Sequence, residues 1–300
     1  MSMNTSRRRW LAGSVVAAAV ALLAVVVPAA AARPSNSSHS ARHDSGYLAL
    51  GDSVAFGFRP GALTPTSAYL HANNFGGYAE ALSGIDALSL ANASCPGETS
   101  GSMVTPGAQS NGCENSLGSP VGYRTNFPLH VAYSGTQLAY AVDYLRHQPR
   151  TGLITISIGA NDLFVCQRTT SDHCTGADFA ATVQQISANL TTIFRALRHD
   201  AHYRGRLVTL AYYSISYTDP VQVAGTQALN TALTAVTRHF DGVVADGFAA
   251  FQRASQSTGG DPCAAGLLLT LPGGTCDVHP SPYGHALLAG AIQQVIGQDD

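Results

Sequence analysis

Short apolar segments alternate with longer amphipathic segments along most of the chain. The apolar segments have the length and composition of buried strands and lie at residues 47–50, 87–91, 153–158, 207–211 and 243–245. Helical patterns separate them at residues 78–82, 137–146, 179–198 and 227–240, and a last helix is predicted at 281–296. Strands that alternate with helices form a parallel sheet covered on both faces. We therefore predict an α/β fold with a central parallel sheet of about five strands.

The first residues have the pattern of an export signal. Three consecutive arginines, Arg7 to Arg9, precede an uncharged apolar stretch, and Pro28 is followed by a run of alanines. A basic start, an apolar centre and a small-residue end predict a signal peptide at residues 1–32. The arginines leave both the Sec and the Tat export routes open. An uncleaved membrane anchor is the alternative, because the apolar stretch is nearly long enough to span a bilayer.

The next segment, residues 33–45, is rich in Ser, His and Arg, and we predict a disordered linker there. No internal repeat and no second linker follow it, so residues 46–300 are predicted to form one domain. Together with the signal peptide, this organisation predicts a secreted, extracellular protein.

Composition and charge narrow the classes of function. The 300 residues are 45% hydrophobic and 11% charged, which is enough apolar material for a sizeable core. The formal net charge is −2, and all sixteen basic residues are arginines. A mildly acidic chain without a basic stripe lacks the electrostatic footprint of a nucleic-acid-binding protein, so no nucleic-acid partner is expected.

The six cysteines suit an exported protein, because an even number in that setting predicts disulfides. They fall into three local pairs, each of which brackets a loop rich in Gly, Ser, Thr or Asn: Cys95–Cys113, Cys166–Cys174 and Cys263–Cys276. We favour this sequential pairing among the fifteen that six cysteines allow. A zinc site is the alternative, but the sequence has no Cys-x-x-Cys spacing.

Candidate chemistry follows the predicted strands, because active sites of parallel sheets lie beyond the carboxyl ends of the strands. Ser53 comes just after the first strand, in Gly-Asp-Ser, where a strand-to-helix turn can expose its hydroxyl group. The N-terminal dipole of the following helix would favour negative charge there. The structural alternative is a plain helix cap, for which Ser is also suited.

Gly97 and Asn161 follow the second and third predicted strands. The N–H of a glycine can approach a substrate oxygen closely, and an asparagine amide can donate to an oxyanion. An ordinary turn is an equally good explanation for each segment taken alone.

Two histidines near the C-terminus are candidate bases. His279 precedes a proline, which favours a loop over a helix interior, and a loop histidine can take a proton from a serine. His285 is the rival, but its place in the body of the last predicted helix favours packing or capping. A surface histidine without a catalytic role is the alternative for His279.

These segments together, in this order at the strand ends of one α/β domain, resemble the SGNH or GDSL hydrolase family over nearly all of residues 46–297. The resemblance implies a flavodoxin-like, three-layer α/β/α sandwich. It also implies that Ser53 is the nucleophile and His279 the general base. The implied oxyanion hole consists of the backbone N–H groups of Ser53 and Gly97 and the side chain of Asn161. Val54 stands where the family usually has Leu, a conservative change.

One position departs from the family pattern. The family usually has an aspartate three residues before the histidine, where this chain has Cys276, and Asp277 lies only two before it. Either Asp277 still reaches the imidazole ring, or the backbone carbonyl of Cys276 orients it and leaves a Ser–His dyad. We favour the dyad, which predicts that Asp277→Ala keeps substantial activity.

The resemblance implies a secreted serine esterase or lipase that needs no metal or cofactor. Its partner would be a small-molecule or lipid ester, with contact to a lipid interface left open, and we expect a monomer. Apolar residues beside the motifs could line an acyl pocket: Phe56, Phe58, Leu163 and Phe164. An acyltransferase, a carbohydrate deacetylase and a non-catalytic secreted binding protein are the alternative functions.

Overall fold

The computed structural model describes residues 46–297. The predicted signal peptide and linker lie outside the described residues.

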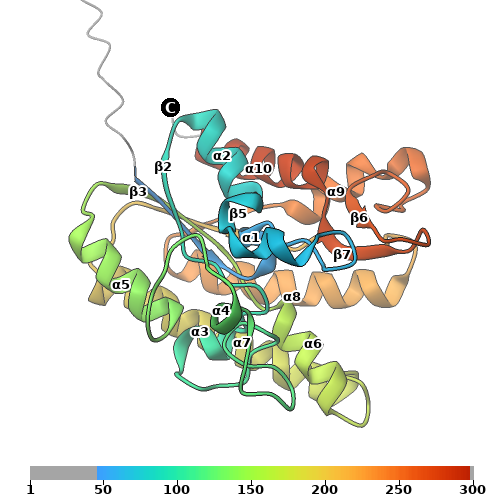
Figure 1. Ribbon diagram of the computed structural model, residues 1–300, viewed down its shortest axis with the longest axis horizontal. Coiled ribbons are helices and arrows are strands. Elements are labelled where there is room, and N and C mark those ends of the chain that lie inside the picture. Colours follow the sequence, from blue (N-terminus) through green and yellow to red (C-terminus); the bar gives the residue numbers. More distant parts are fainter. Residues whose placement is uncertain (1–45, 298–300) are drawn as a thin grey trace, which may run out of the picture. The chain divides into compact units, whose positions relative to one another are not determined.

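A five-stranded parallel sheet lies at the centre of the described domain (Figure 1). Its strands are β1 (Gly46–Gly51), β2 (Ser89–Asn92), β3 (Thr151–Ser157), β4 (Arg206–Leu210) and β5 (Val243–Ala245). The spatial order is β2-β1-β3-β4-β5, and every neighbouring pair is parallel. All five predicted strands are present within a few residues of their predicted bounds, so the α/β prediction is confirmed.

Helices cover both faces of the sheet and make the three layers of the sandwich. On one face α2 (Tyr78–Asp86) and α9 (Gly247–Ala254) pack against α10 (Pro282–Ile296), which lies above the sheet in Figure 1. The other face carries the chain of contacts α5 (Gln137–His147), α3 (Ser100–Val104), α7 (Gly176–Arg195) and α8 (Pro220–His239). Side chains of both layers meet those of the strands in one large buried cluster.

Several short elements complete the domain. They are α1 (Ser53–Phe56), α4 (Tyr123–Asn126), α6 (Ala160–Thr169), the antiparallel pair β6 (Leu268–Thr270) and β7 (Cys276–Pro280), a π-helical turn (Ala196–Asp200), and 3₁₀ turns at Thr66–Leu70, Ala72–Asn74 and Gln256–Thr258. The sequence predicted none of these, except that its helix at 179–198 runs into the π-helical turn. It also placed the start of α8 seven residues too late. Asp219 caps that helix through its carboxylate and Pro220 occupies its first turn, a start signal that the apolar pattern alone does not show.

Three disulfides join Cys95 to Cys113, Cys166 to Cys174 and Cys263 to Cys276, the sequential pairs that the sequence favoured. The first and second bridges lie beside segments that line the main pocket described below, and the third joins β7 to a preceding turn.

Candidate active site

The strand order places the candidate residues at the point where the chain reverses direction across the sheet. From β1 the chain moves to one side to form β2, and then crosses to β3 on the other side. Ser53 follows β1 and Asn161 follows β3, so both lie at the carboxyl ends of the two strands that flank this switch point. Ligands of open α/β sheets bind in the crevice at such a point.

A tight turn after β1 presents Ser53. Gly51 has a φ of 126°, and a Cβ atom there would lie 2.0 Å from the carbonyl oxygen of Ser157. The turn therefore requires glycine. Asp52 caps α1 by accepting a 2.9 Å hydrogen bond from the N–H of Val54, and Ser53 becomes the first residue of that helix.

Two aspartates, the buried Asp52 and the partly buried Asp162, hold the turns on either side of the site. Asp52 accepts a hydrogen bond from the Tyr212 hydroxyl, and burial raises its pKa to about 6 against the lowering effect of that bond. Asp162 accepts hydrogen bonds of 2.8 and 2.6 Å from the N–H and hydroxyl of Ser100, and burial again raises its pKa to about 6. No hydrogen bond joins either carboxylate to Ser53 Oγ, so both support the turns.

His279 and Asp277 complete a three-residue hydrogen-bonded chain with the serine. The Nε2 atom of His279 lies 2.9 Å from Ser53 Oγ. The other ring nitrogen, Nδ1, bonds the Asp277 carboxylate, which also accepts a 3.0 Å hydrogen bond from the His279 backbone N–H. The sequence favoured a dyad oriented by the carbonyl of Cys276, whereas in the structure the Asp277 carboxylate contacts the ring.

The local backbone explains why the two-residue spacing works. The sequence placed His279 in a loop, but it lies in β7, and in an extended strand residues two apart point to the same side. Asp277 and His279 therefore both face Ser53. The proline after His279 favours that extended conformation. Tyr213, which stacks on Phe251, donates a 2.6 Å hydrogen bond to the carbonyl of Val278 and holds the strand in place.

The electrostatics fit an aspartate that remains charged beneath the imidazole. Burial acts to raise the pKa of Asp277, but the hydrogen bonds and charge of His279 outweigh it, and the net pKa is lowered. A carboxylate in this position fixes the ring tautomer with Nε2 as an acceptor and stabilises the imidazolium that forms when the ring takes a proton.

The rival histidine, His285, has no contact with the serine. It is buried in α10, where burial and the nearby charge of His279 lower its pKa to about 3. A histidine that stays neutral and buried is a packing residue, in agreement with the sequence interpretation.

Three candidate hydrogen-bond donors line the pocket that contains Ser53. The N–H of Ser53 is in the first position of α1, where a helix offers no internal acceptor. Gly97 has a φ of 83°, and a Cβ atom there would lie 2.6 Å from the carbonyl oxygen of Asn111, so the chain passes close to its neighbour only because the residue is glycine. Asn161 is buried near the start of α6. All three residues line one pocket with His279.

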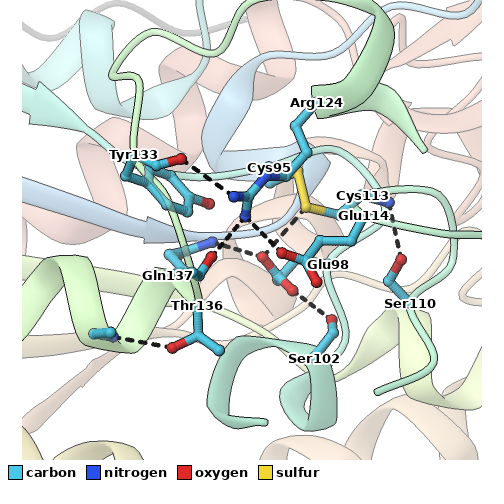
Figure 2. Close-up of polar contacts among 12 residues, drawn as sticks. Cys95, Glu98, Ser102, Ser110, Cys113, Glu114, Arg124, Tyr133, Thr136 and Gln137 are labelled. Atoms are coloured by element: carbon cyan, nitrogen blue, oxygen red, sulfur yellow. Dashed lines mark hydrogen bonds and ion pairs between the residues drawn. A yellow bond between two sulfur atoms is a disulfide. The ribbon is translucent and has the colours of Figure 1, made fainter. Parts of the chain in front are cut away.

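A buried polar network surrounds Glu98, the residue that follows Gly97 (Figure 2). Glu98 is 1% exposed and accepts hydrogen bonds from the hydroxyl of Ser102 and, at 3.1 Å, from the side-chain amide of Gln137. The same Gln137 amide clamps the Gly51 backbone, accepting from its N–H at 2.6 Å and donating to its carbonyl at 3.0 Å. The network thus links the turn that carries Ser53 to the turn that carries Gly97.

Glu98 also lies against the disulfide of Cys95 and Cys113, and within residues 46–297 these three form the one compact group of potential metal ligands. The two sulfur atoms are bonded to each other and are not thiolates, so the group does not fit a metal ion.

The burial of the Glu98 carboxyl group predicts that this residue makes a pH-dependent contribution to the free energy of unfolding. Burial, aided by Glu114 and opposed by Ser102, Gln137 and Arg124, raises its pKa from 4.5 to about 7. The unfolded chain loses this proton at lower pH than the folded protein does. The contribution is therefore complete below about pH 4.5 and is lost as the pH rises to about 7, with a magnitude of about 3 kcal/mol.

Replacing Glu98 by Gln removes this titration and keeps the shape of the side chain. The free energy of unfolding of the wild type, measured with urea from pH 4 to 9, should fall relative to that of E98Q between pH 4.5 and 7 and run parallel above pH 8. Subtracting the free energy of unfolding of E98Q from that of the wild type cancels the pH-dependent contributions of Asp52, Asp162 and His285, which both proteins share. Parallel curves over the whole range would show that Glu98 titrates normally.

One large pocket opens above these residues, with a volume of about 1150 Å³. Its far walls come from α6, α7 and α8 and are mainly apolar, through Leu163, Phe164, Phe179, Val221, Ala224 and Leu229, although Arg168 also lines them. Phe58 lines it too and packs on the His279 ring, with centroids 5.1 Å apart. Phe56 does not line it, because this ring is fully buried among Phe75 and Tyr123 in a second core cluster.

Comparisons with known proteins agree with this geometry. The chain matches the GDSL-like lipase/acylhydrolase family model over residues 49–287. A search of curated proteins found no match.

Solved structures share the fold at low sequence identity. Acetylxylan esterase Axe2 from Geobacillus stearothermophilus is 17% identical, with 86% of this chain and 98% of that chain covered and a TM-score of 0.52. Phospholipase A1 from Streptomyces albidoflavus NA297 is 16% identical, with 84% and 99% covered and a TM-score of 0.50. The lipase Lip_vut3 from a goat rumen metagenome is 15% identical, with 83% and 96% covered and a TM-score of 0.51.

Proposed function

The chain belongs to the GDSL-like lipase/acylhydrolase family, and we propose that it hydrolyses carboxylic esters of extended acyl chains through an acyl-enzyme on Ser53. The observation that carries the proposal is the 2.9 Å contact between Ser53 Oγ and His279 Nε2 at the floor of a large, mainly apolar pocket.

The proposed reaction has two halves. His279 takes the proton of Ser53 as the serine oxygen attacks the ester carbonyl, and Asp277 stabilises the imidazolium. The N–H groups of Ser53 and Gly97 and the amide of Asn161 hold the negative oxygen of the tetrahedral intermediate. His279 then protonates the departing alcohol. In the second half a water molecule, deprotonated by the same ring, releases the acid and restores the serine.

The pocket supports an extended acyl group. Its volume exceeds the range of about 300–1000 Å³ that is usual for small-molecule sites, and apolar helix residues form the wall beyond the serine. An acetyl group would contact only the part nearest Ser53. Each further CH₂ that leaves water for the apolar wall should contribute about 0.8 kcal/mol to transition-state binding.

A panel of p-nitrophenyl esters tests this substrate class. With purified protein, kcat/KM should rise from the acetate toward medium and long chains, by up to about fourfold per added CH₂ until the pocket is filled. Acetylated xylan and xylo-oligosaccharides serve as the competing substrates. Faster turnover of these, with a flat chain-length profile, would replace the proposal by carbohydrate deacetylation. A folded protein that hydrolyses none of the panel would overturn it.

Gly225 on α8 offers a more local test of the acyl wall. It lines the pocket, and a Cβ atom there would lie 3.9 Å from the Phe179 ring, so a larger side chain can be accommodated without a backbone clash. G225L should fill part of the channel and lower kcat/KM at least about tenfold for long-chain esters while leaving acetate and butyrate within about twofold.

The matched control is Gly290→Leu, the same change in α10, where a Cβ atom would meet nothing within 4 Å. G290L should keep the wild-type chain-length profile. An unchanged profile in G225L would mean that the acyl chain does not run along α8.

The proposed place of action is outside the cell, at an ester-bearing lipid surface or in solution. The export pattern at the N-terminus and the three disulfides, which form in oxidising compartments, support export. Within residues 46–297 no helix has the length and apolarity needed to cross a bilayer. Two apolar residues at the pocket, Val221 and Ile215, are 74% and 40% exposed, which supports contact with a lipid interface.

A further inference from the structure

The side-chain amide of Asn161 has two ends that oppose each other chemically. Its Nδ2 atom can donate to an oxyanion, whereas its Oδ1 atom would repel one. Rotation by half a turn about the last side-chain bond exchanges them at almost no steric cost. An asparagine in an oxyanion hole therefore needs neighbours that fix which end faces the substrate.

Asn111 supplies the first such contact. Its Nδ2 atom donates a 2.6 Å hydrogen bond to Asn161 Oδ1. With Oδ1 engaged in this way, the Nδ2 atom of Asn161 is left for the pocket, which Asn161 and Asn111 both line. Asn111 is itself an amide, however, and could turn in the same manner.

Arg168 removes that second ambiguity. Its guanidinium group donates to Asn111 Oδ1 and also lines the pocket. A guanidinium group has five N–H donors and no acceptor, so only the oxygen end of Asn111 can face it. Within residues 46–297 no carboxylate forms an ion pair with Arg168, which leaves its donors for this contact.

We propose that Arg168 and Asn111 are positioning residues that hold the Asn161 amide with its N–H toward the oxyanion. The hydrogen bonds run one way, from Arg168 to Asn111 to Asn161, because the guanidinium group can only donate. We call these three side chains the relay. This inference rests on the proposed function, in which Asn161 stabilises the tetrahedral intermediate.

The backbone of Asn111 serves the neighbouring donor as well. Its N–H donates a 2.7 Å hydrogen bond to the carbonyl of Gly97, in the turn whose own N–H is the second proposed oxyanion donor. The disulfide between Cys95 and Cys113 closes this loop. One residue thus aligns two of the three donors, one through its main chain and one through its side chain.

Asn111→Asp separates this role from a merely structural one. Aspartate has nearly the same shape and keeps the pairing with Arg168, so a structural role predicts that N111D is milder than N111A. A carboxylate can only accept, however, and would turn the Asn161 amide so that Oδ1 faces the oxyanion. The relay predicts a kcat about 100-fold or more below wild type in N111D and less than about tenfold below it in N111A, with KM nearly unchanged in both.

Further substitutions test the role of the Arg168 guanidinium group and control for the added negative charge of N111D. Thr169→Glu places a carboxylate one residue from Arg168 on α6, at a position that does not line the pocket, and it should keep kcat within about twofold. R168K retains an obligate donor and should stay within about threefold of wild type, whereas R168M should lose up to about tenfold in kcat. Arg168 is exposed, so neither of its variants should fail to fold.

The kinetic order of the variants decides the proposal. An active wild type with N111D clearly below N111A, R168M below R168K, and T169E normal supports the relay. An active wild type in which N111D equals or exceeds N111A overturns the relay and leaves the proposed function standing. A wild type that hydrolyses no ester overturns the proposed function, and the relay with it, because no oxyanion would then form for Asn161 to bind.

Discussion

Replacing His279 by alanine should lower kcat for ester hydrolysis by about 10⁴- to 10⁶-fold, the largest effect we expect from any substitution that leaves Ser53 in place. In the wild type, Nε2 lies 2.9 Å from Ser53 Oγ and can take its proton during attack. Without the ring the serine remains a neutral alcohol and a poor nucleophile. The N–H donors at Ser53 and Gly97 and the amide of Asn161 remain, which sets a residual rate above that in water.

The variant should also fail to react with a fluorophosphonate probe, which labels activated serines. Peptide mass spectrometry is expected to find the adduct on Ser53 in the wild type and no adduct in H279A. His147→Ala is the matched control, because His147 is exposed on α5. Labelling of Ser53 that persists in folded H279A would mean that another group activates the serine.

The central sheet and the main helices could be predicted because the spacing of apolar residues along the chain follows which positions of a strand or helix are buried. Strand β3 has an unbroken run of apolar and β-branched residues, and the amphipathic pattern of α7 spans most of its length. The hairpin of β6 and β7 escaped prediction for the opposite reason. Its strands are three and five residues long and mostly half-exposed, so they carry no apolar pattern.

The residues proposed to meet the substrate could be named from the sequence, but those that hold them could not. Ser53, Gly97 and Asn161 follow β1, β2 and β3, and His279 stands directly before a proline near the C-terminus. The supports come from segments far along the chain, such as Gln137, which is 86 residues from the Gly51 backbone that it clamps. A glutamine at the start of an amphipathic helix gives no signal of such a contact, because the contact depends on how the helix packs.

The spacing of Asp277 and His279 shows how local conformation decides what a spacing means. The family pattern has an aspartate three residues before the histidine, and this chain has Cys276 at that position. Comparison with that pattern led the sequence interpretation toward the Cys276 carbonyl. In a strand the residue two positions away shares the face. The misplaced loop prediction for His279 and the expectation that the Cys276 carbonyl contacts its ring therefore have one cause.

Asp277→Asn should lower kcat by about 10²- to 10⁴-fold with little change in KM, in contrast to the mild effect that a dyad would predict. The carboxylate contacts His279 Nδ1 and accepts from the backbone N–H, so it orients the ring and carries the charge that stabilises the imidazolium. An amide keeps the size but not the charge, and its N–H₂ group can hold the ring in the wrong tautomer.

The measurement is kcat and KM on a short, water-soluble ester for D277N and D277A, with circular dichroism to confirm folding. Asp219→Asn is the matched control. Asp219 is exposed at the start of α8, where asparagine caps a helix about as well as aspartate, so D219N should keep wild-type kinetics.

Because the Asp277 carboxylate touches no substrate atom in the proposed mechanism, its loss should appear in kcat and leave fluorophosphonate labelling slowed but still on Ser53. D277N and D277A that both retain more than about a tenth of wild-type kcat would mean that ring orientation comes from the backbone of β7 after all.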